Sequence, residues 1–161
     1  MRLLFIRHAI AVPAQASLRD EDRPLTTEGE KSFCQTARML ARVAGRPRAI
    51  LTSPHVRAQR TAEIAAQAWG KLRPIVVPGL ADGDWPAVCR ALASYRGDDT
   101  IALVGHEDWM SDVTARFLGS RCRRAFAYRK GGAALIDAED LRQCKGTLLW
   151  FIPPRVFRRL G

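Results

Sequence analysis

Long apolar runs are missing from this chain of 161 residues. No window supplies the roughly 20 consecutive apolar residues that a membrane-spanning helix needs. The opening stretch MRLLFIRHAI is also too short, and charged too early, for a secretory signal peptide. Since 47% of the residues are hydrophobic and 26% are charged, we expect one compact cytoplasmic domain over residues 1–161.

Paired cysteines and glycine-rich phosphate loops are missing as well. The cysteines lie far apart with no CxxC pair, at Cys34, Cys89, Cys122 and Cys144. This spacing indicates reduced structural thiols, and it favours neither a zinc site nor a disulfide framework. The absence of a P-loop excludes nucleotide-binding proteins that depend on one. We therefore expect no metal and no cofactor.

Acidic residues are scarce relative to basic ones, 16 against 26, which gives a formal net charge of +10. Such an excess favours anionic partners, whether phosphorylated molecules, acidic protein faces or nucleic acid. The arginine clusters at 121–124 and 155–159 lack the interleaved aromatic residues of a single-strand stacking platform. We expect both clusters to face solvent, and we expect no nucleic-acid or membrane partner. The oligomeric state stays open.

The elements that are present alternate along the chain. Short apolar runs suited to strands start at Arg2 and near positions 49, 74, 100, 132 and 147. Helical patterns occupy 26–45, 53–69, 84–95 and 106–119. The order is four strand–helix pairs followed by two strands, which predicts an α/β fold with a mainly parallel sheet.

Local signals predict where the first two helices begin and end. Thr27 and Glu30 have the spacing of a capping box, and Gly45 suits the left-handed residue that ends a helix. Ser53 suits the cap of the second helix, with Pro54 at its first helical position.

Three histidines are present, and each follows a predicted strand: His8, His55 and His106. The carboxyl ends of parallel strands meet at one edge of a sheet, which is where such folds bind ligands. A long charged connection, 9–26, also leaves the first strand at this edge. We therefore expect the histidines to converge there.

Two arginines accompany these histidines. Arg7 precedes His8, and Arg57 falls in the first turn of the second helix. A guanidinium binds two oxygens of a phosphate at once, and a helix N-terminus adds unpaired N–H groups. This set predicts a pocket in which the arginines hold a phosphoryl group, His8 attacks it, and His106 stabilises the developing charge as a second cationic donor.

These residues carry a family resemblance. The sequence resembles the histidine phosphatase superfamily, and within it the short SixA-type phosphohistidine phosphatases. The matching motifs are FIRHAIA, RPLTTEGE, LTSPHVRAQRTAE, VGHE, KGGAALID and TLLWFIPPRVFRRL. The resemblance covers the chain essentially end to end. It implies a phosphoglycerate-mutase-like, three-layer α/β/α sandwich with a mainly parallel sheet and no cap domain over the site.

The resemblance also implies roles for single residues. His8 is the nucleophile that becomes phosphorylated, Arg7 and Arg57 bind phosphate, and His106 is the second histidine of the pocket. His55 stands at a variable motif position and is at most a neighbour of the pocket. Ala9 replaces the glycine that the family commonly has after the nucleophile.

The residue that acts as general acid stays open at this point. Asp82 lies where the acid of the mutase branch would fall, and Glu107 directly follows His106. Asp84 instead suits the cap of the next helix because Pro86 fits its first turn. We rank Asp82 before Glu107. Arg60, one helical turn after Arg57, is expected to face solvent.

These observations predict a metal-independent phosphatase that acts through phospho-His8 on protein phosphohistidine. One alternative keeps the site but hydrolyses small phosphate esters, and another is a phosphate-binding module without turnover. Mutase activity is disfavoured because no cap shelters a transferred phosphoryl group from water.

Overall fold

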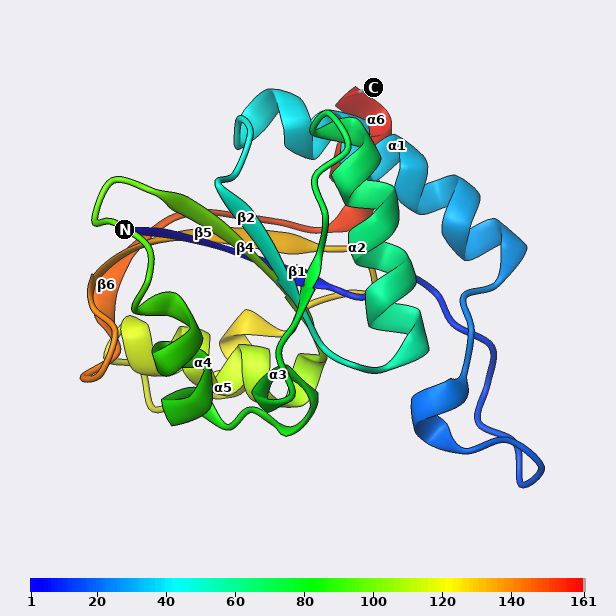
Figure 1. Cartoon of the computed structure of the whole chain (residues 1–161), viewed down its shortest axis with the longest axis horizontal. Helices are drawn as coiled ribbons and strands as arrows, with labels where there is room; N and C mark the ends of the chain where they lie inside the picture. The colour runs from blue at the N-terminus through cyan, green and yellow to red at the C-terminus, as the bar shows by residue number, and fades with distance from the viewer. Residues whose placement is uncertain (161) are drawn as a thin grey trace.

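A six-stranded sheet forms the centre of the computed structural model (Figure 1). The structure describes residues 1–160, except the side chains of Arg123, Arg124, Arg158 and Leu160. The strand order is β3-β2-β4-β1-β5-β6. The first four of these run parallel, β5 is antiparallel to β1, and β6 is antiparallel to β5, which confirms the mainly parallel sheet. The strands are β1 (Arg2–Arg7), β2 (Ala49–Thr52), β3 (Ile75–Val76), β4 (Thr100–Gly105), β5 (Ala133–Asp140) and β6 (Lys145–Ile152).

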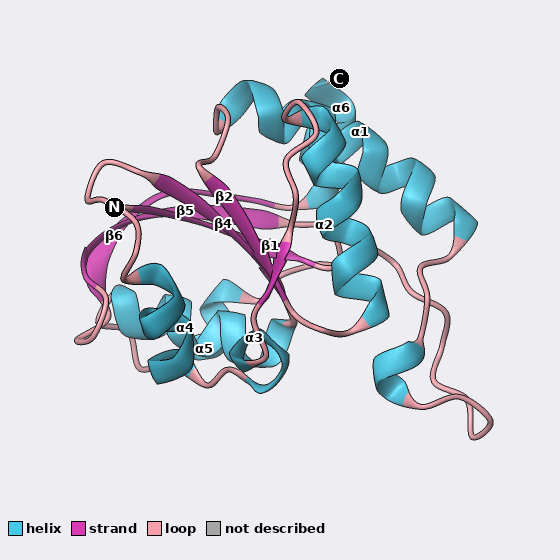
Figure 2. Cartoon of the chain, viewed as in Figure 1, coloured by secondary structure: helices cyan, strands magenta, loops and turns pink. Residues whose placement is uncertain are grey.

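Helices cover both faces of the sheet, as the three-layer prediction requires (Figure 2). One face carries α1 (Thr27–Val43), α2 (Val56–Ala68) and α6 (Pro154–Leu160). The other carries α3 (Gly79–Asp82), α4 (Trp85–Leu92) and α5 (Glu107–Phe117). Two 3-10 turns, η1 (Asp20–Asp22) and η2 (Arg123–Phe126), lie in connections. No cap domain covers the sheet edge in the described part of the chain.

Strand β1 is buried on both sides. Leu3 and Phe5 pack in the core under α4 and α5, whereas Leu4 and Ile6 pack in the core under α1 and α2. All four side chains are fully buried. A strand covered on both faces has a continuous apolar sequence, which explains the run LLFI. β1 also lies between β4 and β5, so its carboxyl end opens at the middle of the sheet edge.

Two predicted helix starts were wrong, the first by one residue and the second by two. Helix α1 is capped by Thr26, whose Oγ1 accepts from the Gly29 N–H at 2.9 Å, and not by Thr27. Its predicted end is confirmed, since Gly45 has φ +68°. Helix α2 begins at Val56 rather than at Pro54. Ser53 is therefore not its cap, and its hydroxyl is used elsewhere.

The side chains of Glu30 and Arg60 join the two helices. The Arg60 guanidinium donates to Glu30 Oε1 and Oε2 at 2.6 and 2.9 Å, and to Glu63 at 3.1 Å. Glu30 therefore does not complete a capping box. Arg60 was expected to face solvent alone, and instead it ties α2 to α1.

The arginine-rich tail, predicted as solvated, forms helix α6. Phe157 within it is fully buried, and its ring meets Trp150 edge-on at a centroid distance of 6.3 Å. The apolar side chain holds the helix on the sheet, while Arg155 is exposed. The predictions for Arg158 and, in the other cluster, for Arg123 and Arg124 lie outside the described side chains. Asp84 caps α4 as predicted, since its Oδ1 accepts from the Ala87 N–H at 3.1 Å.

Within residues 1–160, no helix combines the length and the apolar character that crossing a membrane requires.

Replacing Gly29 by alanine is expected to destabilise the fold by about 1–3 kcal/mol, as overpacking does. A Cβ on Gly29 would lie 2.1 Å from the Ile10 carbonyl oxygen, a backbone atom that cannot turn aside. Urea unfolding measures the loss. Gly97→Ala is the matched control, since a Cβ there meets nothing within 4 Å. Equal unfolding free energies for the two variants would contradict this close approach.

Candidate active site

The carboxyl ends of β1 and β4 bring two histidines together. The backbone N–H of His8 donates to the Gly105 carbonyl at 3.0 Å, so the pairing of β1 with β4 continues to this residue. His106 directly follows β4. The two imidazole rings lie 5.2 Å apart between centroids, and both side chains are buried. The expected convergence of these two histidines is present in the structure.

His8 has one ring nitrogen fixed and one available. Its Nδ1 lies 2.7 Å from the Ala9 carbonyl oxygen, which can only accept, so Nδ1 carries the proton of the neutral ring. Burial lowers the pKa of His8 to about 3, and the nearby charges of Arg57, Arg7 and Lys130 add to this, against the Ala9 hydrogen bond. The ring is therefore neutral near pH 7, with the Nε2 lone pair unprotonated.

Ala9 is held from a second side. Its N–H donates to Thr61 Oγ1 at 3.0 Å, and that hydroxyl donates to the Arg57 carbonyl at 2.6 Å. Helix α2 thus fixes the peptide that orients His8. Ala9 is not among the described residues with positive φ, so the alanine in place of glycine adopts its conformation without backbone strain.

His106 lies between Ser53 and Arg57. Its Nε2 is 2.9 Å from Ser53 Oγ, and its Nδ1 is 3.5 Å from Arg57 Nη2. Because a guanidinium can only donate, Nδ1 is the acceptor and Nε2–H donates to the serine. Burial and the neighbouring His8 and Arg57 lower the pKa of His106 to about 3.

Both predicted arginines lie beside these rings. Arg57 is buried, and it donates to the Asp20 carbonyl at 2.5 Å and to Asp20 Oδ2 at 2.8 Å. Arg7 Nη1 donates to the Tyr128 carbonyl. The Nε–H groups of Arg7 and Arg57 are buried and have no partner among the described residues. Each of these two guanidiniums thus keeps one buried donor without a partner in the described structure.

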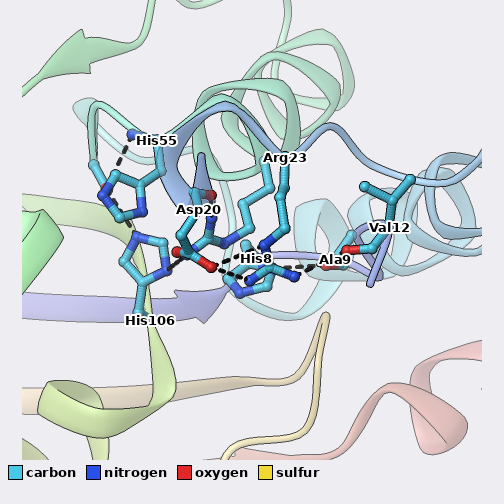
Figure 3. A network of polar contacts seen from close by, with 9 residues as sticks. His8, Ala9, Val12, Asp20, Arg23, His55 and His106 are labelled. Atoms are coloured by element: carbon cyan, nitrogen blue, oxygen red, sulfur yellow. Dashed lines mark hydrogen bonds and ion pairs between the residues drawn. The ribbon is translucent and has the colours of Figure 1, made fainter. Parts of the chain in front are cut away.

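The third histidine is a neighbour of the pocket. The His55 ring lies 4.6 Å from the His106 ring between centroids, on the side away from His8 (Figure 3). His55 is half-buried, and burial lowers its pKa. No hydrogen bond joins it to His8 or Arg57 in the described structure.

The carboxylates predicted as general acids have local partners. Asp82 is exposed at the end of α3, and its Oδ1 accepts from the Asp84 N–H at 3.3 Å. Glu107 Oε1 accepts from the Ser111 hydroxyl at 2.7 Å. Asp20 contacts Arg57 directly, and the charge of Glu107 acts on the Arg7 guanidinium. The catalytic roles of Asp82 and Glu107 stay predictions.

Sequence reasoning missed three polar contributors: Asp20, Ser53 and Thr61. Ser53 and Thr61 belong to the motif SPxxRAxxTA, so motif membership was a usable signal for them. Asp20 stands in a charged connection of no periodicity, and its contact with Arg57 spans 37 positions. In the part of the chain that the structure describes, no group of three metal-ligating side chains occurs.

Acidification is expected to destabilise the fold through the two buried histidines. Their pKa is about 6.5 in the unfolded chain and about 3 in the folded one, so the unfolded state binds more protons between these values. This stability is present above about pH 6.5 and is lost as the pH falls toward 3, with a slope of up to about 1.4 kcal/mol per pH unit for each histidine.

Urea unfolding from pH 7 to pH 4 measures this slope. The variant His8→Asn is expected to show a shallower decline than the parent, because carboxylate titrations are common to both. Identical slopes would mean that His8 takes up its proton as readily in the folded state as in the unfolded one.

Comparison with known proteins agrees with this geometry. A family model of the histidine phosphatase superfamily, branch 1, matches residues 3–88. An uncharacterised protein of Picosynechococcus sp. is 40% identical over 110 residues, which make up 66% of this chain and 67% of that protein. A structure of the protein histidine phosphatase SixA complexed with tungstate superposes with a TM-score of 0.81 at 23% identity, covering 97% of this chain and 99% of that one. A protein of Agrobacterium tumefaciens assigned as the phosphohistidine phosphatase SixA gives a TM-score of 0.79 at 23% identity, with coverage of 95% and 97%.

Proposed function

The chain belongs to the histidine phosphatase superfamily, and on that premise we propose that it hydrolyses phosphohistidine on proteins through a covalent phospho-His8 intermediate. The observation that carries the proposal is the bond between His8 Nδ1 and the Ala9 carbonyl. It leaves a neutral ring with its Nε2 lone pair free, near the buried Arg57 and the half-buried Arg7. A neutral imidazole nitrogen is a competent nucleophile near pH 7.

The proposed reaction has two displacements at phosphorus. In the first, His8 Nε2 forms a bond to phosphorus while the bond to the leaving imidazole breaks. In the second, a water oxygen attacks the phosphoryl group, the bond to Nε2 breaks, and the water loses its proton to solvent. Inorganic phosphate leaves, and His8 returns neutral. The route uses side chains alone, so activity is expected to persist in a metal chelator.

The arginines and His106 would stabilise the negative charge of the phosphoryl group during its transfer. Arg7 and Arg57 have buried Nε–H donors without a partner, which suits oxygens of a phosphoryl group. A phosphoryl dianion beside His106 would favour the imidazolium form, because an opposite charge nearby raises a histidine pKa. His106 would then donate to the equatorial oxygens.

Two features of the site favour phosphohistidine as the substrate: the lack of a clear general acid and the lack of a cap over the site in residues 1–160. The leaving imidazole of phosphohistidine can be protonated by solvent beforehand, so a missing general acid costs little. An alkyl phosphate would lose about the 10²- to 10⁴-fold that a general acid supplies. Asp82 and Glu107 have local partners, and no cap covers the site in residues 1–160. An uncovered pocket suits a phosphate that another protein displays, and SixA-type proteins share this fold.

Steady-state kinetics on a panel of substrates tests the proposal. The panel pairs a phosphohistidine-bearing protein with small monoesters of sugars and nucleosides, each assayed with and without a chelator. The proposal expects kcat/KM to be at least about 10²-fold higher for the phosphohistidine protein, as the general-acid argument requires. A single small ester preferred over all others would instead indicate a small-molecule phosphatase. Phosphate binding without any turnover would leave a binding module.

A further inference from the structure

Asp20, labelled in Figure 3, contacts Arg57, the arginine proposed above to bind phosphate. It lies in η1, within the long connection that follows β1. The Asp20 carbonyl and Oδ2 accept from Nη1 and Nη2 of Arg57 at 2.5 and 2.8 Å. The side chain of Arg57 is 6% exposed, whereas that of Asp20 is 56% exposed. A solvent-accessible carboxylate therefore covers a buried guanidinium.

Asp20 is also held from the outside. Arg23 Nη2 lies 2.7 Å from Asp20 Oδ1, and Arg23 Nη1 donates to the Val12 carbonyl at 2.9 Å. Although partial burial acts to raise the pKa of Asp20, hydrogen bonds from Arg57 and Arg23 hold it below its ordinary value. The carboxylate is therefore ionised at neutral pH. Its contacts with Arg57 and Arg23 fix its position beside the proposed phosphate site.

The position of this charge matters for any anion that enters. Arg57 Nη2 contacts Asp20 Oδ2 and lies 3.5 Å from His106 Nδ1, so one amino group faces both the carboxylate and the pocket. A phosphoryl dianion on Arg57 would meet Asp20 as a like charge. Either the carboxylate moves away and loses its ion pair, or it stays and repels the ligand. Both cases weaken anion binding.

We propose that Asp20 competes with the phosphoryl group for Arg57 and so weakens the binding of phosphate at this site. The inference rests on the proposed function, because it concerns the same phosphate site. The competition weakens binding of inorganic phosphate, the product, because Asp20 repels any phosphoryl dianion that reaches Arg57. Asp20 thus acts against retention of the product.

Removal of the charge tests the proposal. Isothermal titration calorimetry with tungstate and with inorganic phosphate compares the parent with Asp20→Asn. The variant is expected to bind both ions roughly 3- to 10-fold more tightly. The gain is expected to shrink as ionic strength rises, since salt screens an exposed charge. A change in loop structure alone would not show that salt dependence.

Asp22→Asn is the matched control. Asp22 lies in the same 3-10 turn and pairs with Arg19 at 2.8 Å, and no contact joins it to Arg57 in the described structure. It is expected to bind both ions like the parent. Asp20→Ser, which removes the charge but keeps a hydroxyl, repeats the measurement if the asparagine variant loses thermal stability.

Three outcomes decide the question. Tighter binding by both Asp20 variants, with Asp22→Asn unchanged, supports the proposal. Equal or weaker binding by the Asp20 variants overturns it, and weaker binding means that Asp20 only positions Arg57. If neither parent nor variants bind either ion, the proposed function itself fails, and the inference falls with it.

Discussion

Replacing His8 by asparagine is expected to abolish the covalent phosphoryl adduct and to lower turnover by about 10⁴-fold or more, as loss of a nucleophile does. Asparagine is close in size and keeps an amide N–H for the Ala9 carbonyl, but it has no nitrogen lone pair that can attack phosphorus. The measurement is intact mass after brief exposure to phosphoramidate. The quench is alkaline, because phosphohistidine is labile in acid.

His55→Asn is the control for this experiment. It removes another histidine of the pocket region, yet its ring lies against His106 and has no hydrogen bond to His8 in the described structure. The control variant is expected to form the adduct. An adduct that persists in His8→Asn would show that another residue is phosphorylated. If the parent forms no adduct and releases no phosphate, the proposed catalysis is wrong and the chain only binds phosphate.

Replacing Arg57 by alanine is expected to lower kcat/KM by about 10²- to 10³-fold, the typical cost of one preorganised donor at a developing charge. The substitution also removes one of the two arginines that pair with the Asp20 carboxylate, which adds repulsion toward the substrate. Initial rates on a phosphohistidine protein measure the loss. Added guanidinium ion is expected to restore part of the activity, since it fits the space of the missing group.

Arg60→Ala gives the matched comparison. Arg60 lies three residues further along α2 and pairs with Glu30 and Glu63, outside the pocket. Half-exposed ion pairs of this kind contribute about 0–1 kcal/mol to stability, so this variant is expected to fold and to keep its activity. Equal losses in the two variants would mean that the charge of α2 as a whole, and not the placement of Arg57, supports the reaction.

The hydrophobic pattern predicted the sheet and most of its helices. A strand that is buried on both faces has a continuous apolar sequence, and a helix that packs on a sheet has apolar residues along one side. LLFI in β1 is apolar throughout since both faces are covered. The starts of the first two long helices, α1 and α2, were predicted less accurately. Two threonines stand next to each other, and the choice between Thr26 and Thr27 depends on which backbone N–H the hydroxyl meets. Ser53 resembled a helix cap, but its hydroxyl contacts His106 across 53 positions.

The site was predictable to the extent that it follows strand ends. His8 and His106 come directly after neighbouring parallel strands, so topology alone brings them together. Asp20 could not be found this way. Its connection has no periodicity, and its path depends on Arg23 holding both Asp20 and Val12. Contacts of that kind arise only once the chain has folded.

The central position of β1 has a consequence for folding. β1 is the first strand along the chain, yet its two neighbours, β4 and β5, begin only at Thr100 and Ala133. During synthesis, LLFI therefore leaves the ribosome about a hundred residues before any strand can pair with it. Pairings this distant form slowly, and an unpaired apolar strand promotes aggregation meanwhile. Production of this protein is accordingly expected to depend on chaperone capacity.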